Sequence, residues 1–300
     1  MLEWFSANQF FIDITLINCL LVLSVSVVFQ AGVFSLASVG FMSVGAYTTA
    51  ILTTKEGMPL TVGIIAAAVG TALTGLIVGL IVLRLEGIYL ALATLALAQA
   101  VLVLIETIGI TDADQGIIGI PTITTTWIVI PILVVVAAVF QVIHRSHHGR
   151  AIHLLRADPV IARSLGVRVR GYKLAALAAS GLLAGLAGAL DAHEVGAIDP
   201  TQYSFSLLVI ALTYAVVGGV AYWAGPLVAA IGLGLLNQFL HGSGTTIETA
   251  VYGFVLIALM FVAPQGLGDP RLRGLVTAVV ARRRPQRSQA DQADLEEIRQ

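Results

Sequence analysis

Charged residues are scarce in this sequence: Asp, Glu, Lys and Arg make up 11% of its 300 residues, whereas 58% are hydrophobic. A soluble domain carries roughly 25% charged residues, so this deficit excludes a soluble globular protein and predicts a polytopic, all-α membrane protein. The single cysteine, Cys19, lies in an apolar run, which excludes an intrachain disulfide and a cysteine-based metal site. The first residues lack a basic segment, so we expect no cleaved signal peptide.

Catalytic motifs are also missing. The sequence has neither a His-Glu-x-x-His metal motif nor a phosphate-binding Walker sequence, so we expect no metal and no ATP hydrolysis in this chain. Four histidines between 144 and 153 lie in a solvated basic stretch, where a metal cation would be repelled. Ionisable residues are nearly absent from the apolar runs, since Asp13 and Glu106 lie near their ends. A proton- or ion-coupled carrier usually needs such residues, so energy input from outside the membrane is favoured.

A membrane-spanning helix needs about 20 mainly apolar residues, and by this length the sequence predicts about nine spans, with eight to ten as the range. They lie near residues 10–30, 32–53, 60–83, 87–106, 127–143, 172–190, 204–222, 225–240 and 247–263. Residues 1–281 form the predicted transmembrane domain. The polar, charged residues 282–300 are expected to be a disordered cytoplasmic tail.

The predicted orientation depends on one basic loop. Residues 144–173 carry seven of the sixteen Lys and Arg residues, opposed only by Asp158, and basic loops stay in the cytoplasm. The loops 107–126 and 191–203 carry acidic residues but no Lys or Arg. We therefore expect them outside, together with the N-terminus, and the C-terminus inside.

A short helix is predicted inside the basic loop. Asp158 is a favourable N-cap, Pro159 suits the first helical position, and Gly166 is a natural stop. A capped cytoplasmic helix on an otherwise membrane-buried protein suggests a partner that pushes on it.

Small residues recur at helical spacing in several spans. Examples are Ala37, Gly40, Ser43 and Ala46, then Thr71, Gly75 and Gly79, then Gly181 and Gly185. Close helix packing is the simplest interpretation. The alternative is a broken helix of the kind that lines a transporter cavity, for which the second run and the Gly218-Gly219 pair are the candidates.

Four segments resemble the M-type membrane subunits of ABC importers for branched-chain amino acids. They are FSLASVGFMSVGAYTTA (34–50), EGIYLALATLALAQ (86–99), GRAIHLLRADPVIARSLGV (149–167) and VVGGVAYWAGPLVAAIG (216–232), and FVAPQGLGD (261–269) is similar to the family's closing motif. The resemblance implies a type II-like importer permease fold whose cytoplasmic loop is a coupling helix for an ATPase. The coupling residues that it implies are Gly149, Arg150, Ala151, Arg156, Asp158, Pro159, Ala162, Ser164, Leu165 and Gly166.

The resemblance also implies partners. These are a homologous H-type permease subunit, two cytoplasmic ATPase subunits that bind ATP and Mg, and an extracytoplasmic substrate-binding protein, all at the bacterial inner membrane. The acidic outer residues are the candidates for docking that protein: Asp112, Asp114, Asp191, Glu194 and Asp199. Polar or aromatic residues within spans are candidates for the pathway, although each can equally serve as an interhelix hydrogen bonder: Ser43, Tyr47, Tyr89, Thr94, Gln99, Thr213 and Tyr214.

The expected function is ATP-driven import of branched-chain or other hydrophobic amino acids, in which this chain is not itself an enzyme. Import of urea or short amides by the same architecture is the near alternative. A stand-alone channel or facilitator for a small neutral solute is the alternative from another class, and it has no need for a capped docking helix.

Overall fold

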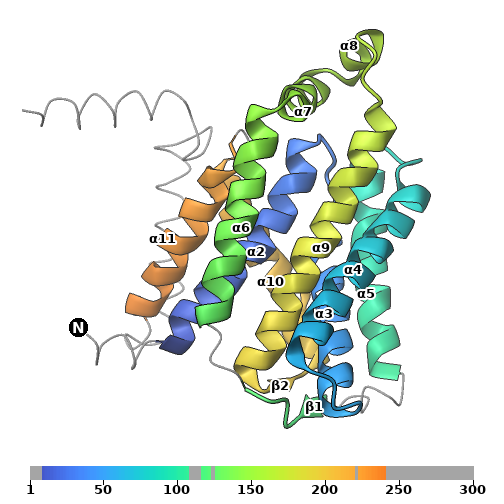
Figure 1. Cartoon of the computed structure of the whole chain (residues 1–300). Helices are drawn as coiled ribbons and strands as arrows, with labels where there is room; N and C mark the ends of the chain where they lie inside the picture. Colours follow the sequence, from blue (N-terminus) through green and yellow to red (C-terminus); the bar gives the residue numbers. More distant parts are fainter. Residues whose placement is uncertain (1–8, 108–115, 123–125, 220–221, 241–300) are drawn as a thin grey trace, which may run out of the picture.

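The computed structural model describes residues 9–107, 116–122, 126–219 and 222–240, which form ten α-helices, one 3-10 helix and two very short strands. Figure 1 shows the long helices running roughly alongside one another, with α7 and α8 at one end and the strands β1 and β2 at the other. We call these the loop end and the strand end. The predicted 247–263 span, the motif at 261–269 and the 282–300 tail lie outside the described residues.

Eight helices correspond to the first eight predicted spans. Five are long and apolar enough to cross a membrane: α2 (Gln9–Gln30), α4 (Leu60–Val82), α5 (Ile88–Thr107), α6 (Thr126–Arg145) and α9 (Val169–Val195). Three are shorter: α3 (Ser38–Thr54), α10 (Phe205–Gly218) and α11 (Ala224–Leu240). At 1.5 Å per residue, α10 is only about 21 Å long, less than the ~30 Å hydrocarbon core.

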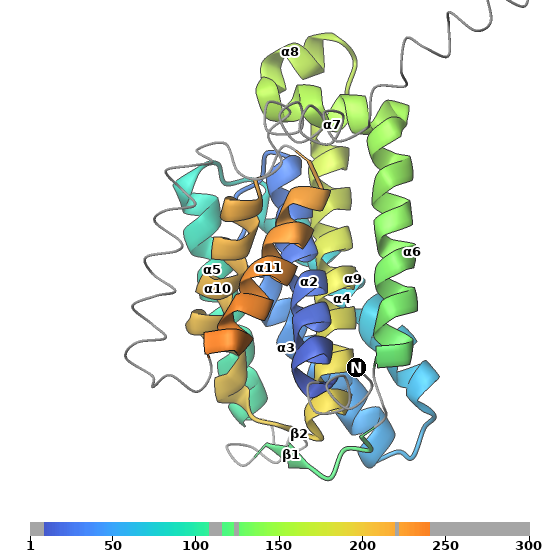
Figure 2. The same ribbon diagram turned by 90° about the vertical axis from the view of Figure 1, so that its left-hand side faces the viewer.

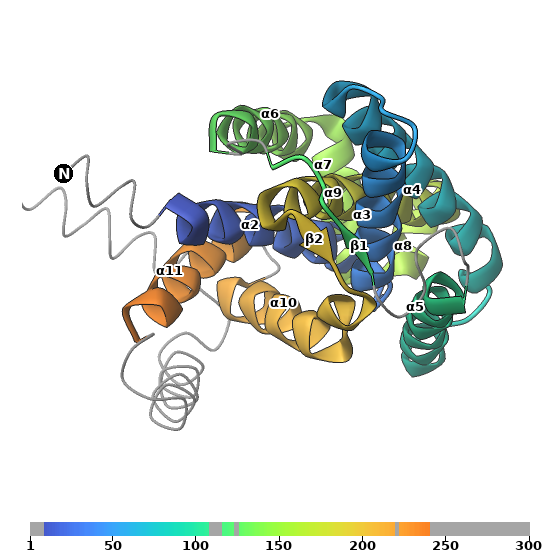
Figure 3. The ribbon, with the colours of Figure 1, turned by 90° about the horizontal axis from the view of Figure 1, so that it is seen from below.

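The centre of the bundle is formed by α2, α3 and α9. In the view along the helices, the other long helices surround these three, and α6 stands at the edge of the bundle (Figures 2 and 3). Burial agrees with this arrangement, because α2 buries thirteen side chains whereas α6 buries only Val129 and Leu133.

Small residues allow α3 and α4 to pack closely on α9, as predicted. A Cβ atom on Gly185 would lie 1.9 Å from the Thr71 hydroxyl oxygen, and one on Gly45 would lie 2.5 Å from the backbone of Gly185. Likewise, a Cβ atom on Gly181 would lie 2.2 Å from the Thr71 carbonyl oxygen. A side chain at any of these glycines would force the helices apart. The glycines of α9 therefore support the interpretation of close helix packing.

The second predicted span is only partly helical. Gly32 has a φ of +67° at the end of α2, and α3 begins at Ser38, so residues 31–37 are not helical, contrary to the prediction of a span from residue 32. The Leu36 N–H donates to the Thr94 hydroxyl at 2.9 Å, about 9 Å along α5 from its first residue. The Thr94 hydroxyl therefore satisfies a backbone N–H of this non-helical stretch. A membrane interior tolerates non-helical backbone only where the protein satisfies its polar groups in this way.

The two predicted outer loops meet at the strand end. β1 (Ile117–Ile118) pairs antiparallel with β2 (Ala197–Ile198), in the register Ile117 to Ile198. Gly116 precedes β1 with a φ of +69°, and a Cβ there would lie 2.0 Å from the Ile198 carbonyl oxygen. This pairing places residues 116–118 and 197–198 at the same end of the molecule, as the charge pattern predicts.

Candidate functional site

The basic loop contains the predicted short helix with the predicted cap. Helix α8 (Pro159–Ser164) starts at Asp158, whose Oδ1 accepts hydrogen bonds from the N–H groups of Val160 (2.7 Å) and Ile161 (3.1 Å). Gly166 follows α8 with a φ of +82°, and its N–H donates to the Arg163 carbonyl oxygen at 3.0 Å. The carboxylate satisfies two N–H groups that have no helical partner, and the glycine supplies the left-handed turn that ends the helix.

A second helix precedes α8, and the sequence analysis missed it. Helix α7 (His147–Ala157) is capped by Ser146, whose hydroxyl accepts from the His148 N–H at 3.1 Å. Its start is fixed tightly against α6, because a Cβ on Gly149 would lie 2.4 Å from the His144 carbonyl oxygen. The signal available in the sequence was Ser146 before an apolar spacing at Ile152 and Leu155.

The loop has a small hydrophobic core of its own. Leu155 of α7, Ala162 of α8 and Val169 of α9 form this loop cluster and are almost completely buried. On the inner side, a Cβ on Gly32 would lie 3.5 Å from the Arg156 Cα, so the end of α2 lies against the end of α7. The α7–α8 unit (147–164) therefore packs against α2, α6 and α9.

Helix α8 and its C-cap residue expose three large apolar side chains beside Arg163 and Ser164. Val160, Ile161 and Leu165 are 71%, 51% and 68% exposed, although they lie in the most basic part of the chain. Large apolar side chains exposed together commonly mark an interaction surface. Val160 and Ile161 were not among the predicted site residues, whereas Leu165 was.

The predicted coupling residues divide into two groups. Gly149 and Ala162 are buried, and Asp158 and Gly166 shape the backbone, so these four build the unit. The other six lie at least partly exposed on the unit and its exit: Arg150, Ala151, Arg156, Pro159, Ser164 and Leu165. All ten are therefore brought together at the loop end.

The predicted pathway residues are not brought together. Ser43, Tyr47, Thr94 and Tyr214 are buried in the bundle, whereas Tyr89 and Gln99 are exposed on α5 and Thr213 is partly exposed on α10. Two of the buried hydroxyls bond to their own helix: Ser43 to the Gly40 carbonyl oxygen and Thr94 to that of Ala91. The Tyr47 hydroxyl is buried and has no hydrogen-bond partner among the described residues.

Of the predicted docking residues, Asp112 and Asp114 lie outside the described residues. Asp191 accepts a hydrogen bond from the Tyr203 hydroxyl at 3.0 Å, and Asp199 caps the 3-10 helix η3 (Pro200–Tyr203) by accepting from the Thr201 N–H at 2.8 Å. Burial, and the nearby Asp191 carboxylate, raise the pKa of Tyr203 well above its usual value. The Tyr203 hydroxyl thus joins η3 to α9 through Asp191, and Asp199 fixes the start of η3. Glu194, in the last turn of α9, lies near Asp191.

Comparison with known proteins gives a family match over most of the chain. Residues 10–264 match the family described as "Branched-chain amino acid transport system / permease component". The high-affinity branched-chain amino acid transport system permease protein LivM of Escherichia coli K12 is 29% identical over 290 residues, covering 85% of this chain and 68% of LivM. LivM of Salmonella typhimurium LT2 is 28% identical over 289 residues, covering 84% and 68%. The ribose import permease protein RbsC of E. coli K12 is 29% identical over 134 residues, covering 43% and 40%. No solved structure matches the chain.

Proposed function

This chain belongs to the family of branched-chain amino acid transport system permease components, and from that premise we propose that its α7–α8 unit is where an ATPase subunit delivers force. It is a multi-pass membrane protein and a non-catalytic permease component of an ABC transporter, which implies partner subunits. The exposed apolar surface of α8 carries the proposal, because a solvated topological loop needs basic residues but no such surface.

In the proposed complex the loop end faces the cytoplasm and the N-terminus lies outside. α3, α10 and α11 also cross the membrane, residues 247–263 supply a ninth span, and the fold is type II-like. Two ATPase subunits bind inside, one of them on α8. A homologous H-type permease completes the pathway, and a substrate-binding protein docks at the acidic strand end.

The contacts of the α7–α8 unit suggest how movement would spread. A displacement of α8 would pass through Ala162 to Val169 at the start of α9, which share the loop cluster. It would also reach α2 through the close approach of Arg156 to Gly32. Because α9 packs almost without gaps on α3 and α4, we expect these helices to move as one body and switch the pathway by rigid-body rocking.

The proposed cargo is leucine, isoleucine or valine, because the names of the LivM relatives state branched-chain amino acid transport for those proteins. Urea and short amides are the near alternative within the same architecture. Competition during uptake separates them: excess unlabelled leucine should abolish uptake of labelled isoleucine, whereas urea should not. Uptake of labelled urea that unlabelled urea blocks and leucine does not, together with no uptake of labelled isoleucine, would assign the chain to an amide importer.

The coupling proposal is tested by cysteine cross-linking in the assembled complex. A Ser164→Cys variant should cross-link to an ATPase subunit, and a Met58→Cys variant at the strand end should not. Absence of cross-linking at Ser164, in a complex that still contains its ATPases, would show that α8 is not the docking helix. A stand-alone facilitator would retain no ATPase at all.

A further inference from the structure

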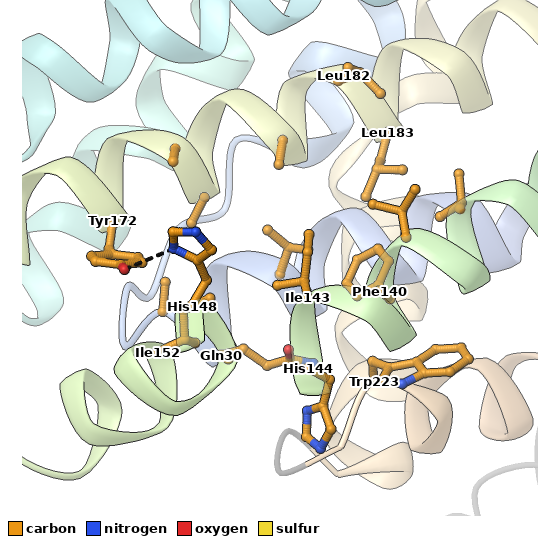
Figure 4. A pocket seen from close by; sticks show the side chains of 18 of the residues that line it. Gln30, Phe140, Ile143, His144, His148, Ile152, Tyr172, Leu182, Leu183 and Trp223 are labelled. Atoms are coloured by element: carbon orange, nitrogen blue, oxygen red, sulfur yellow. Dashed lines mark hydrogen bonds between the residues drawn. The ribbon is translucent and has the colours of Figure 1, made fainter. Parts of the chain in front are cut away.

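A long apolar cavity of about 860 Å³ lies between α6 on one side and α2 and α9 on the other, and α7 covers its loop end (Figure 4). On α6 the lining runs from Pro131 to His144, a distance of about 20 Å. One leaflet of a bilayer has a hydrocarbon thickness of roughly 15 Å, half of the usual core. The cavity is therefore long enough for an extended acyl chain.

The cavity is open from the side of the bundle. Its lining residues Val135 and Val139 of α6 are 61% and 49% exposed, and Ala175 of α9 is also exposed. The part of the cavity between α6 and α9, which we call the shaft, is lined mostly by aliphatic side chains, among them Ile132, Leu182 and Leu183. A zwitterionic amino acid would lose its hydration there without gaining charged partners, so this shaft is unsuited to the transported substrate.

The polar part of the lining is confined to the loop end. His148, Ile152 and Arg156 recur every four residues along α7 and all line the cavity, so they form one stripe at its mouth. His148 Nδ1 lies 3.0 Å from the Tyr172 hydroxyl of α9, as the dashed line in Figure 4 shows. The Arg156 side chain is exposed and has no acidic partner among the described residues. Below the mouth, Gln30 Nε2 of α2 is a buried donor without a partner in the described chain.

We propose that this cavity is a binding site for an anionic phospholipid. One acyl chain occupies the shaft between α6 and α9, and the phosphate lies against Arg156 and His148 at the mouth. Gln30 lies at the depth of the ester groups, whose carbonyl oxygens would accept its N–H. Basic pockets between transmembrane helices commonly bind acidic head groups in this way.

Charge complementarity favours this occupant over a neutral lipid or a protein helix. Of the seven Lys and Arg residues between 144 and 173, Arg156 lines the cavity and the other six lie elsewhere in the same loop, opposed by one acidic residue, Asp158. Assignment to the cytoplasmic leaflet rests on the proposed orientation, whereas the existence of the site does not. The bound lipid would fill the space that separates α6 from the central helices, and would brace α7 where it meets α6.

The test uses the full transporter complex, equilibrated in bilayers of equal phosphatidylglycerol and phosphatidylcholine and then extracted in mild detergent. Native mass spectrometry counts the lipids retained. We expect one phosphatidylglycerol to be retained per copy of this chain. The Ala179→Phe variant, which places a ring in the shaft, should lose it, and the Val134→Phe variant, which changes an exposed residue outside the cavity, should keep it.

A second pair of variants tests the head group without changing the shaft. Arg156→Gln should reduce the preference for phosphatidylglycerol over phosphatidylcholine about five-fold, as expected for one cation near an anionic lipid. Arg150→Gln, on α7 but outside the cavity, should leave the preference unchanged. Equal retention of both lipids by the unmodified complex, or no difference between the paired variants, would overturn the proposal. Cross-linking of a Val139→Cys variant to another subunit would also overturn it, because a protein helix would then occupy the cavity.

Discussion

The exposed apolar side chains of α8 allow a quantitative prediction about docking. Burying a whole Val or Leu side chain stabilises by roughly 1.5–3 kcal/mol. Val160 and Leu165 are 71% and 68% exposed, so a partner can bury about two-thirds of each. Each side chain should therefore contribute ~1–2 kcal/mol to ATPase binding, and Val160→Ser or Leu165→Ser should weaken the affinity about five- to thirty-fold.

The assay is titration of a labelled ATPase subunit onto the permease complex in nanodiscs, followed by measurement of ATPase stimulation. Neither serine variant removes internal packing, so the thermal stability of the permease should stay within about 0.5 kcal/mol of the original. Met58→Ser is the matched control: it changes an exposed apolar residue at the opposite end and should leave ATPase affinity unchanged. Unaltered ATPase affinity in Val160→Ser and Leu165→Ser would refute the reasoning. The basic loop that contains α8 would then serve only to orient the chain in the membrane.

Three further predictions concern the same framework. Asp158→Ala should weaken the start of α8 by about 1 kcal/mol and speed amide exchange at residues 160–161, whereas Asp158→Asn should keep the cap; equal exchange in the two variants would show that capping is incidental. Gly185→Ala should destabilise the bundle by ~1–3 kcal/mol in thermal unfolding because its Cβ would overlap Thr71, whereas Gly70→Ala, which meets nothing within 4 Å, should be neutral or slightly stabilising. Tyr203→Phe should cost ~1.5–3 kcal/mol by leaving Asp191 without its donor, and a melting temperature equal to that of the original chain would show that this hydrogen bond contributes nothing.

Residues close in sequence predicted α8 correctly, although α7 before it was missed. Neighbouring residues alone decide three features of α8: the cap at Asp158, the proline at the first helical position and the left-handed turn at Gly166. The sequence could therefore predict them without knowledge of the tertiary structure. The same holds for the glycines of α9, because close packing in a membrane favours small residues wherever helices meet.

Features that depend on distant residues were predicted only as alternatives or not at all. The non-helical stretch 31–37 has the composition of a membrane helix, and only the hydroxyl of Thr94, 58 positions away from Leu36, compensates its backbone. The short antiparallel pairing of Ile117 with Ile198 depends on α9 returning to the strand end. No local pattern specifies either, so the sequence predicted a second span from residue 32, with a broken helix as the alternative, and two unpaired loops.

The predicted pathway residues do not lie together within this chain, and a pathway shared with a second permease subunit stays a prediction. Polar residues were selected because they lie in apolar runs, but a hydroxyl in a membrane helix can bond to its own preceding turn, as Ser43 and Thr94 do. Sequence does not distinguish that use from a lining role. The Tyr47 hydroxyl differs from these, because it is buried and has no hydrogen-bond partner among the described residues.

The central claim is most directly tested by uptake of labelled leucine into proteoliposomes that hold the co-purified complex, with ATP inside and the substrate-binding protein outside. The account predicts concentrative uptake that requires both additions and is lost when ATP hydrolysis is blocked. Equilibration of leucine without ATP, at the same rate with and without the binding protein, would contradict it and identify the chain as a facilitator.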